Sequence, residues 1–207
     1  MGGPGVGKTI LGIQFLMHGA EKGDKGLYVA LEEQADQVRE DMAEFGWDLS
    51  RIKILDTLQD AASGVWTLKS AGIGGQPDMT LRNLVSAMRE KIQSYKPKRI
   101  VIDSLTSIKM LYETSADMRR DILGLMNFLL ATNCTTILTS EQAGDEVLLE
   151  EFLVSGVIKL DRIYTEGDRL TSISIEKMRG SGFDKHIRPM KITDKGIVVF
   201  SNESLFR

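Results

Sequence analysis

The residues best suited to chemistry lie at the start of the chain, in a glycine-rich stretch that ends with a lysine and a threonine. Residues 2–9 read Gly-Gly-Pro-Gly-Val-Gly-Lys-Thr and fit the Walker A pattern G-x-x-x-x-G-K-[ST] at every fixed position. Glycines let successive backbone N–H groups converge on phosphate oxygens, because a Cβ atom there would block the approach. The predicted nucleotide-binding residues of this stretch are Gly3, Pro4, Gly5, Val6, Gly7, Lys8, Thr9 and Ile10.

Lys8 and Thr9 have separate predicted roles. The Lys8 ammonium reaches the β and γ phosphates, which makes Lys8 a candidate catalytic residue, and the Thr9 hydroxyl is offered to Mg²⁺. The apolar residues that follow predict a helix whose N-terminal end, with its partial positive charge, faces the phosphates. The expected ligands are therefore ATP and Mg²⁺. A glycine turn with no ligand is the alternative, and the number of fixed positions argues against it.

Two more polar groups follow apolar runs that resemble buried strands. Asp103 ends the run Arg-Ile-Val-Ile-Asp at residues 99–103, and ligands gather at the carboxyl ends of strands in open α/β sheets. We therefore predict that Asp103 holds Mg²⁺ together with Thr9, with a helix N-cap as the alternative role. Gln142 follows the run at residues 134–138 and is a candidate sensor of the γ-phosphate. Capping of its own loop is the alternative for Gln142.

A pair of carboxylates, Glu32 and Glu33, follows a third apolar run at residues 26–31. Hydrolysis of ATP needs a group that orients or deprotonates the attacking water, and this strand end is expected to face the γ-phosphate. Successive side chains of a strand point to opposite faces, so one of the two is expected to point inward. We favour Glu32 as the base by a small margin. The alternative is a solvated pair at the start of the next helix.

The elements that must position these groups alternate along the first two thirds of the chain. Helices are expected at residues 8–22, 34–45, 80–95 and 116–131, and strands at residues 26–31, 52–55, 99–104 and 134–138. Residues 60–77 have no clear period and are expected to form a loop. This alternation predicts an α/β fold with a mostly parallel central sheet flanked by helices.

The last third of the chain changes character. Strands are expected at residues 157–163, 170–178, 190–193 and 197–200. A short turn with a glycine, residues 194–196, joins the last two. These strands predict a C-terminal antiparallel extension that joins the parallel strands in one mixed sheet.

Bulk properties fit a single domain over residues 1–207. The chain is 42% hydrophobic and 27% charged, which suits a globular core. Its net charge of −3 gives no general attraction to nucleic acid. The lone Cys134 excludes an intrachain disulfide and fits the cytoplasm, and no apolar run reaches the roughly 18 residues of a membrane span.

Only Met1 precedes the glycine-rich stretch, although a buried strand normally leads into such a loop. We therefore expect the chain to be a fragment that lacks its first strand. The loss of that strand would expose the edges of its two neighbours.

From Gly2 to Phe200 the chain resembles the RecA superfamily of P-loop ATPases and, within it, the KaiC-like single domains. The segments that carry the resemblance are residues 2–9, Leu31-Glu32-Glu33, residues 44–49, Val101-Ile102-Asp103-Ser104, Lys177-Met178-Arg179-Gly180 and residues 192–197. The resemblance implies a RecA-like fold and Mg²⁺-dependent ATP hydrolysis, with Glu32 and Glu33 as the catalytic pair. It also implies a homo-oligomeric ring, usually a hexamer, whose turnover controls a protein partner.

In this family a Lys-x-Arg pair reaches the nucleotide of the neighbouring subunit, and here the matching residues are Lys177 and Arg179. The alternative is an exposed basic strand edge that opposes aggregation. The family's further histidine is replaced by Phe183, and His186 lies three residues later. Where autophosphorylating relatives have Ser and Thr acceptors, this chain has Glu150-Glu151. That replacement disfavours autokinase activity.

Two other functions remain open for such a chain. One is a regulatory switch or scaffold that binds ATP without hydrolysing it. The other is a RecA- or RadA-like DNA-binding motor, for which Arg119 and Arg120 are the best support. The acidic residues Asp145 and Glu146, together with Glu150-Glu151, would repel a phosphate backbone, so nucleic acid is not a favoured partner.

Overall fold

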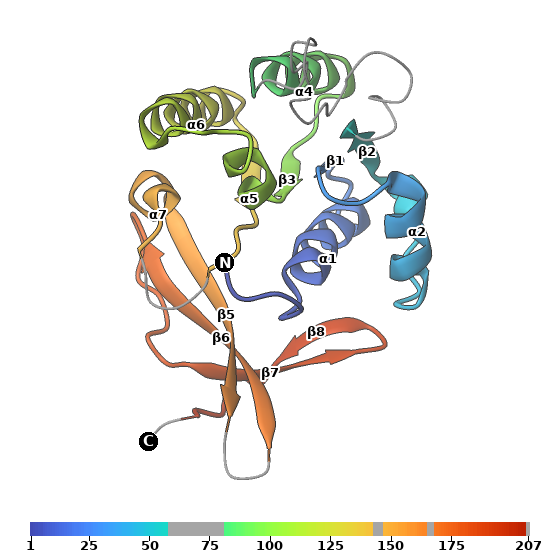
Figure 1. Ribbon diagram of the computed structural model, residues 1–207. Coiled ribbons are helices and arrows are strands. Elements are labelled where there is room, and N and C mark those ends of the chain that lie inside the picture. The colour runs from blue at the N-terminus through green and yellow to red at the C-terminus, as the bar shows by residue number, and fades with distance from the viewer. Residues whose placement is uncertain (58–80, 143–146, 165–167, 206–207) are drawn as a thin grey trace.

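A four-stranded parallel sheet forms the centre of the first two thirds of the chain. The computed structural model describes residues 1–57, 81–142, 147–164 and 168–205. The sheet has the strand order β2-β1-β3-β4 (Figure 1). Its strands are β1 (Gly26–Ala30), β2 (Lys53–Asp56), β3 (Arg99–Asp103) and β4 (Thr135–Leu138). The register places Ala30 opposite both Asp56 and Asp103, so the carboxyl ends of three strands meet at one edge.

Helices cover both faces of this sheet (Figure 1). Alternate residues of β1 enter different cores: Leu27 and Val29 pack in a cluster with residues of α4 and α6, whereas Tyr28 and Ala30 pack in a cluster with residues of α1 and α2. The predicted α/β arrangement is therefore confirmed. The helices are α1 (Lys8–Glu21), α2 (Ala35–Ala43), α4 (Leu81–Tyr95), α5 (Leu105–Lys109), α6 (Ser115–Leu130) and α7 (Leu149–Leu153), with a 3-10 turn η1 (Leu49–Arg51).

The C-terminal strands form a second sheet, which is antiparallel. Its strands, in the order β5-β6-β7-β8, are β5 (Gly156–Tyr164), β6 (Arg169–Met178), β7 (Arg188–Thr193) and β8 (Gly196–Val199). The antiparallel extension is thus confirmed, but the prediction of one mixed sheet is wrong. Within the described ranges β4 and β5 do not pair with each other. Met1 hydrogen-bonds to Ile158 and Leu160 of β5, and Gly2 hydrogen-bonds to Ser140 and Gln142, which follow β4.

The second sheet is held against the parallel sheet and its helices through α1. The Gln14 side chain donates to the Ile197 carbonyl at 3.0 Å and accepts from the Ile197 N–H at 2.7 Å. A small apolar cluster of Val6, Leu160, Met190 and Ile197 lies next to this contact. The glycine-rich loop is therefore enclosed between α1 and the antiparallel sheet.

Several short or irregular elements differ from the predictions. The five-residue helices α5 and α7 were not expected, because they are too short to show a helical period. The loop predicted at residues 60–77 lies outside the described residues, as do Asp145 and Glu146. None of the helices in the described ranges combines the length and apolarity needed to span a bilayer.

The turn before β8 gives a test of this packing. Gly196 has φ +98°, and a Cβ atom there would lie 2.6 Å from Trp47 and 2.7 Å from the Gln14 Oε1 atom. Gly23 has φ +81°, but no described heavy atom would lie within 4 Å of its Cβ. We expect Gly23→Ala to lower the free energy of unfolding by about 1–2 kcal/mol through backbone strain alone. Gly196→Ala should cost about 1–3 kcal/mol more, because it adds a clash.

Urea unfolding of the two variants measures this difference. Equal losses for Gly23→Ala and Gly196→Ala would show that the hairpin does not pack against α1 and Trp47 in the way described.

Candidate active site

The glycine-rich loop has the backbone conformation that its sequence predicts. Gly5 and Gly7 have φ of +69° and +100°, which only glycine adopts at little cost. Gly2 has a second constraint, because a Cβ there would lie 2.1 Å from the Leu160 carbonyl oxygen. The Lys8 ammonium lies across the loop and donates to the carbonyls of Gly2 and Gly3 at 3.0 and 2.9 Å.

Lys8 also has an acidic neighbour that sequence reasoning missed. The Glu141 carboxylate lies 3.5 Å from the Lys8 ammonium and comes from the segment just after β4. The adjacent Gln142 donates its backbone N–H to the Gly2 carbonyl at 3.4 Å. The predicted phosphate sensor is therefore at the loop, while its sensing role stays a prediction.

Thr9 and Asp103, separated by 94 positions in the chain, are in direct contact. The Thr9 hydroxyl donates to the Asp103 Oδ2 atom at 2.7 Å, and the Tyr28 hydroxyl donates to the same atom at 2.8 Å. The Thr139 hydroxyl donates to Oδ1. Asp103 is only 7% exposed, and α5 begins after Ser104. Its carboxylate is thus directed at Thr9 and fixed by three hydroxyls.

This arrangement fits a magnesium ion. Mg²⁺ prefers hard oxygen ligands, takes few of them from protein, and is often completed by phosphate oxygens and water. The Thr9 hydroxyl and the Asp103 carboxylate supply that donor set at the start of α1. The described residues contain no cluster of three or more His, Cys, Asp or Glu side chains that could hold a metal. Burial, and then the Asp103 charge, raise the pKa of Tyr28, so Tyr28 remains a donor.

The two predicted catalytic carboxylates are in different environments. Glu32 Oε1 accepts hydrogen bonds from the hydroxyls of Ser104 and Ser107, the latter at 2.5 Å. Burial raises the pKa of the Glu33 carboxyl, and the charges of Asp41, Asp103 and Glu32 raise it further. Glu32 is therefore oriented by hydroxyls, whereas Glu33 has a raised pKa. The catalytic role of each carboxylate stays a prediction.

Lys177 and Arg179 lie at the end of β6 and contact α7 of the same chain. The Lys177 ammonium donates to the Glu151 carbonyl at 2.6 Å, and the Arg179 guanidinium donates to the Phe152 carbonyl at 2.9 Å. Burial, followed by the Arg179 charge, lowers the pKa of Lys177. Among the described residues neither cation hydrogen-bonds to its own glycine-rich loop. Their role toward a neighbouring subunit stays a prediction.

Glu150 is a buried structural carboxylate. It is 4% exposed, and its Oε1 atom accepts from the Lys109 ammonium at 2.8 Å and from the Ser140 hydroxyl at 2.6 Å. Burial acts to raise the pKa of Glu150, but the hydrogen bonds from Lys109 and Ser140 outweigh it and the pKa is lowered. His186 pairs with Asp184 at 2.8 Å, in a surface cluster away from these contacts.

A second set of missed residues is basic. A recess of about 310 Å³ beside the glycine-rich loop is lined by Gly5, Arg162, Arg169, Thr171, Lys191 and Ile192. A Cβ at Gly5 would lie 2.6 Å from the Arg162 guanidinium. Three cations thus lie next to the phosphate loop. The strands that carry them are far from the loop in sequence, so no local pattern could have indicated this.

Comparisons with known proteins show the family of this chain. The family model described as "ATPase: KaiC" matches residues 1–204. UPF0273 protein PH0284 of Pyrococcus horikoshii is 38% identical over 215 residues, which cover 100% of this chain and 86% of that protein. The circadian clock oscillator protein KaiC of Synechococcus elongatus is 31% identical over 211 residues, which cover 96% of this chain and 39% of that protein.

A solved structure agrees as well. The KaiC-like protein PH0186 from Pyrococcus horikoshii superimposes with a TM-score of 0.80 at 33% sequence identity, and the match covers 96% of this chain and 86% of that one. The RecA-like fold and the resemblance found in the sequence are therefore confirmed. The family match and the 38% identical relative show that this chain belongs to the KaiC-like ATPases of the RecA superfamily.

Proposed function

We propose that the protein binds ATP with Mg²⁺ and hydrolyses it to ADP and phosphate. The observation that carries this proposal is the 2.7 Å contact between Thr9 and Asp103. It joins the phosphate loop to the end of β3 and presents the oxygen ligands that a magnesium nucleotide needs. Arg162 and the other cations of the adjoining recess add positive charge where phosphate groups would lie.

Each of the site residues has a separate role in hydrolysis. Lys8 exchanges the carbonyls of Gly2 and Gly3 for phosphate oxygens and neutralises their charge. Mg²⁺, held by Thr9 and Asp103, supplies further charge neutralisation when it is bound. The base is Glu33, whose raised pKa brings it closer to neutral pH; it takes a proton from the attacking water. Glu32, oriented by Ser104 and Ser107, positions that water.

We further propose that residues 1–207 act as one domain in a homo-oligomeric ring, a hexamer, in the cytoplasm. Lys177 and Arg179 would exchange their α7 carbonyl partners for the nucleotide of the neighbouring subunit, and turnover would control a protein partner. Autokinase activity is not proposed, because Glu150 is a buried ion-pair partner of Lys109. A DNA motor is not proposed, because Arg120 already pairs with Asp117 and Asp121.

Removing the Lys8 ammonium or the charge of the Asp103 carboxylate should abolish ATP turnover. We expect Lys8→Ala and Asp103→Asn each to lower the Mg²⁺-ATPase rate by about 100-fold or more, because each removes charge stabilisation at the transferring phosphate. Lys22→Ala, at an exposed position after α1, serves as the matched control and should keep full activity. Normal ATP binding with no turnover in the unmodified protein would instead identify a nucleotide-dependent switch.

The pH dependence of the rate separates the two carboxylates. Because the pKa of Glu33 is raised above its ordinary value of 4.5, its base form is lost as the pH falls through that higher pKa. The rate should therefore decline on the acid side at a pH above 4.5. Glu33→Gln should remove this decline. Glu32→Gln should lower the rate at every pH, and the decline on the acid side should remain. The reverse pattern would make Glu32 the base, as the sequence alone favoured.

Mixing two inactive variants tests for sites shared between subunits. The Lys8→Ala subunit still has Lys177 and Arg179, and the Lys177→Ala subunit still has an intact phosphate loop. In an equal mixture about a quarter of the interfaces in a ring therefore combine an intact loop with an intact cation pair. ATPase activity should therefore return on mixing. Lys185→Ala, an exposed lysine outside the pair, should be active alone. If mixing restores nothing and Lys177→Ala is already fully active, the sites are not shared.

A further inference from the structure

Three oxygen atoms of the same chain surround the Lys8 ammonium. It donates to the carbonyls of Gly2 and Gly3 at 3.0 and 2.9 Å, and the Glu141 carboxylate lies 3.5 Å away. An ammonium has three N–H donors, so each of them has a partner without any ligand. The Lys8 side chain is 10% exposed, whereas that of Glu141 is 43% exposed. A phosphate group that binds Lys8 therefore has to displace at least one of these partners.

Glu141 supplies the charged member of the three partners, and its backbone is held at the loop. The Gly2 N–H donates to the Ser140 carbonyl at 3.3 Å, and the Gly2 carbonyl accepts from the Gln142 N–H at 3.4 Å. Glu141 is thereby paired with Gly2. Its own N–H donates to the Thr106 hydroxyl at 2.8 Å. The exposed side chain can turn, but the backbone keeps its charge beside the loop.

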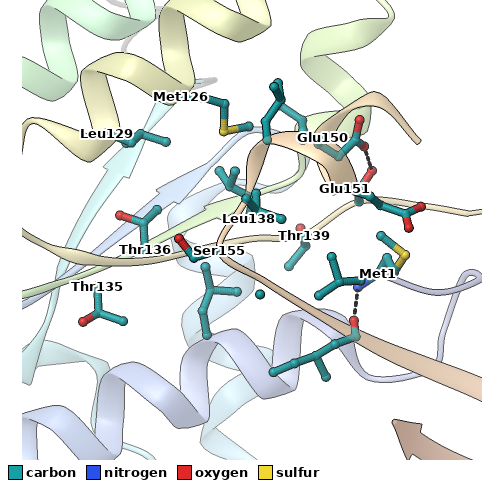
Figure 2. A pocket seen from close by; sticks show the side chains of 18 of the residues that line it. Met1, Met126, Leu129, Thr135, Thr136, Leu138, Thr139, Glu150, Glu151 and Ser155 are labelled. Carbon is teal, nitrogen blue, oxygen red and sulfur yellow. Dashed lines mark hydrogen bonds between the residues drawn. The ribbon is translucent and has the colours of Figure 1, made fainter. Parts of the chain in front are cut away.

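The other nearby carboxylates have different partners. Figure 2 shows Glu150 and Glu151 at one end of a cavity of about 470 Å³ that Lys8 also lines. Glu150 is bound by the Lys109 ammonium at 2.8 Å. Glu151 accepts from the backbone N–H of the residue that precedes α7, also at 2.8 Å. Within the part of the chain that the structure describes, Glu141 is therefore the carboxylate that pairs with Lys8.

We propose that Glu141 discriminates between nucleoside diphosphates and triphosphates, because its carboxylate competes with the terminal phosphate of ATP for Lys8. This inference rests on the proposed binding of ATP. With ADP bound, the ammonium contacts the β-phosphate and keeps Glu141 as a partner. With ATP bound, the γ-phosphate takes the place of the carboxylate on the ammonium. Glu141 thus weakens the binding of ATP more than that of ADP.

Two contributions to the free energy of binding act in this direction. ATP breaks the ion pair between Lys8 and Glu141, whereas ADP leaves it in place. The displaced carboxylate then stays on the same side of the loop as the γ-phosphate, because its backbone is fixed, and two negative charges at short range repel each other. An amide in place of the carboxylate removes both contributions and keeps the size of the side chain.

The test compares the binding of two nucleotides to Glu141→Gln. Titration calorimetry measures the affinity for ADP and for a non-hydrolysable ATP analogue, each with Mg²⁺ and at low salt. Glu141→Gln should tighten binding of the analogue by about 5-fold or more, as expected for a partly exposed ion pair, and should change ADP binding by less than about 2-fold. Glu90→Gln, which makes the same charge change at an exposed position of α4, is the matched control and should change neither affinity.

Salt gives a second readout that a change in loop shape would not move. At about 1 M salt the Debye length falls to about 3 Å, so the gain in affinity for the analogue should shrink. A gain that salt leaves unchanged would overturn the proposal. Equal changes for both nucleotides would also overturn it and would leave the proposed function intact. If the unmodified protein binds neither nucleotide, the proposed function and this inference fail together.

Discussion

The parallel alignment of β1 and β3 is the constraint on which the candidate site depends. Because Ala30 lies opposite Asp103, the residues that follow both strands emerge side by side at one edge of the sheet. This brings Glu32 to Ser104 and Ser107 and leaves Asp103 directed at Thr9. A shift of one residue would reverse the face of every side chain on the strand and would separate these groups.

The antiparallel sheet contributes to the candidate site by packing against the phosphate loop. Its strands carry no member of the Thr9–Asp103 contact, yet β5 limits the shape of the loop at Gly2 and brings Arg162 to Gly5. The two bonds between Gln14 and Ile197 fix this sheet to the helix that begins at the phosphate loop. The loop is therefore held from both sides, by a helix that starts in it and by a sheet that packs over it.

Local patterns in the sequence were enough to predict the parts of the fold with strong local signals. The runs at residues 26–31 and 99–104 are short, apolar and buried, and the Walker A pattern fixes the start of α1, so β1, β3 and α1 could be predicted closely. The pairing of strands is not local, which is why one mixed sheet was predicted where two occur. The five residues of α5 and of α7 are too few to show a period. Ser104, Ser107, Glu141 and Arg162 could not be assigned, because their partners lie far along the chain.

The short helix α5 links features that are otherwise distant. Ser104 and Ser107 at its start hold Glu32, and Lys109 at its end is the partner of the buried Glu150 on α7. The carbonyls at the end of α7 receive Lys177 and Arg179. The five residues of α5 thus connect Glu32 with the helix that receives Lys177 and Arg179. Polar contacts run without a break from Glu32 through α5 to α7. A displacement at one end of α5 can therefore be transmitted to its other end.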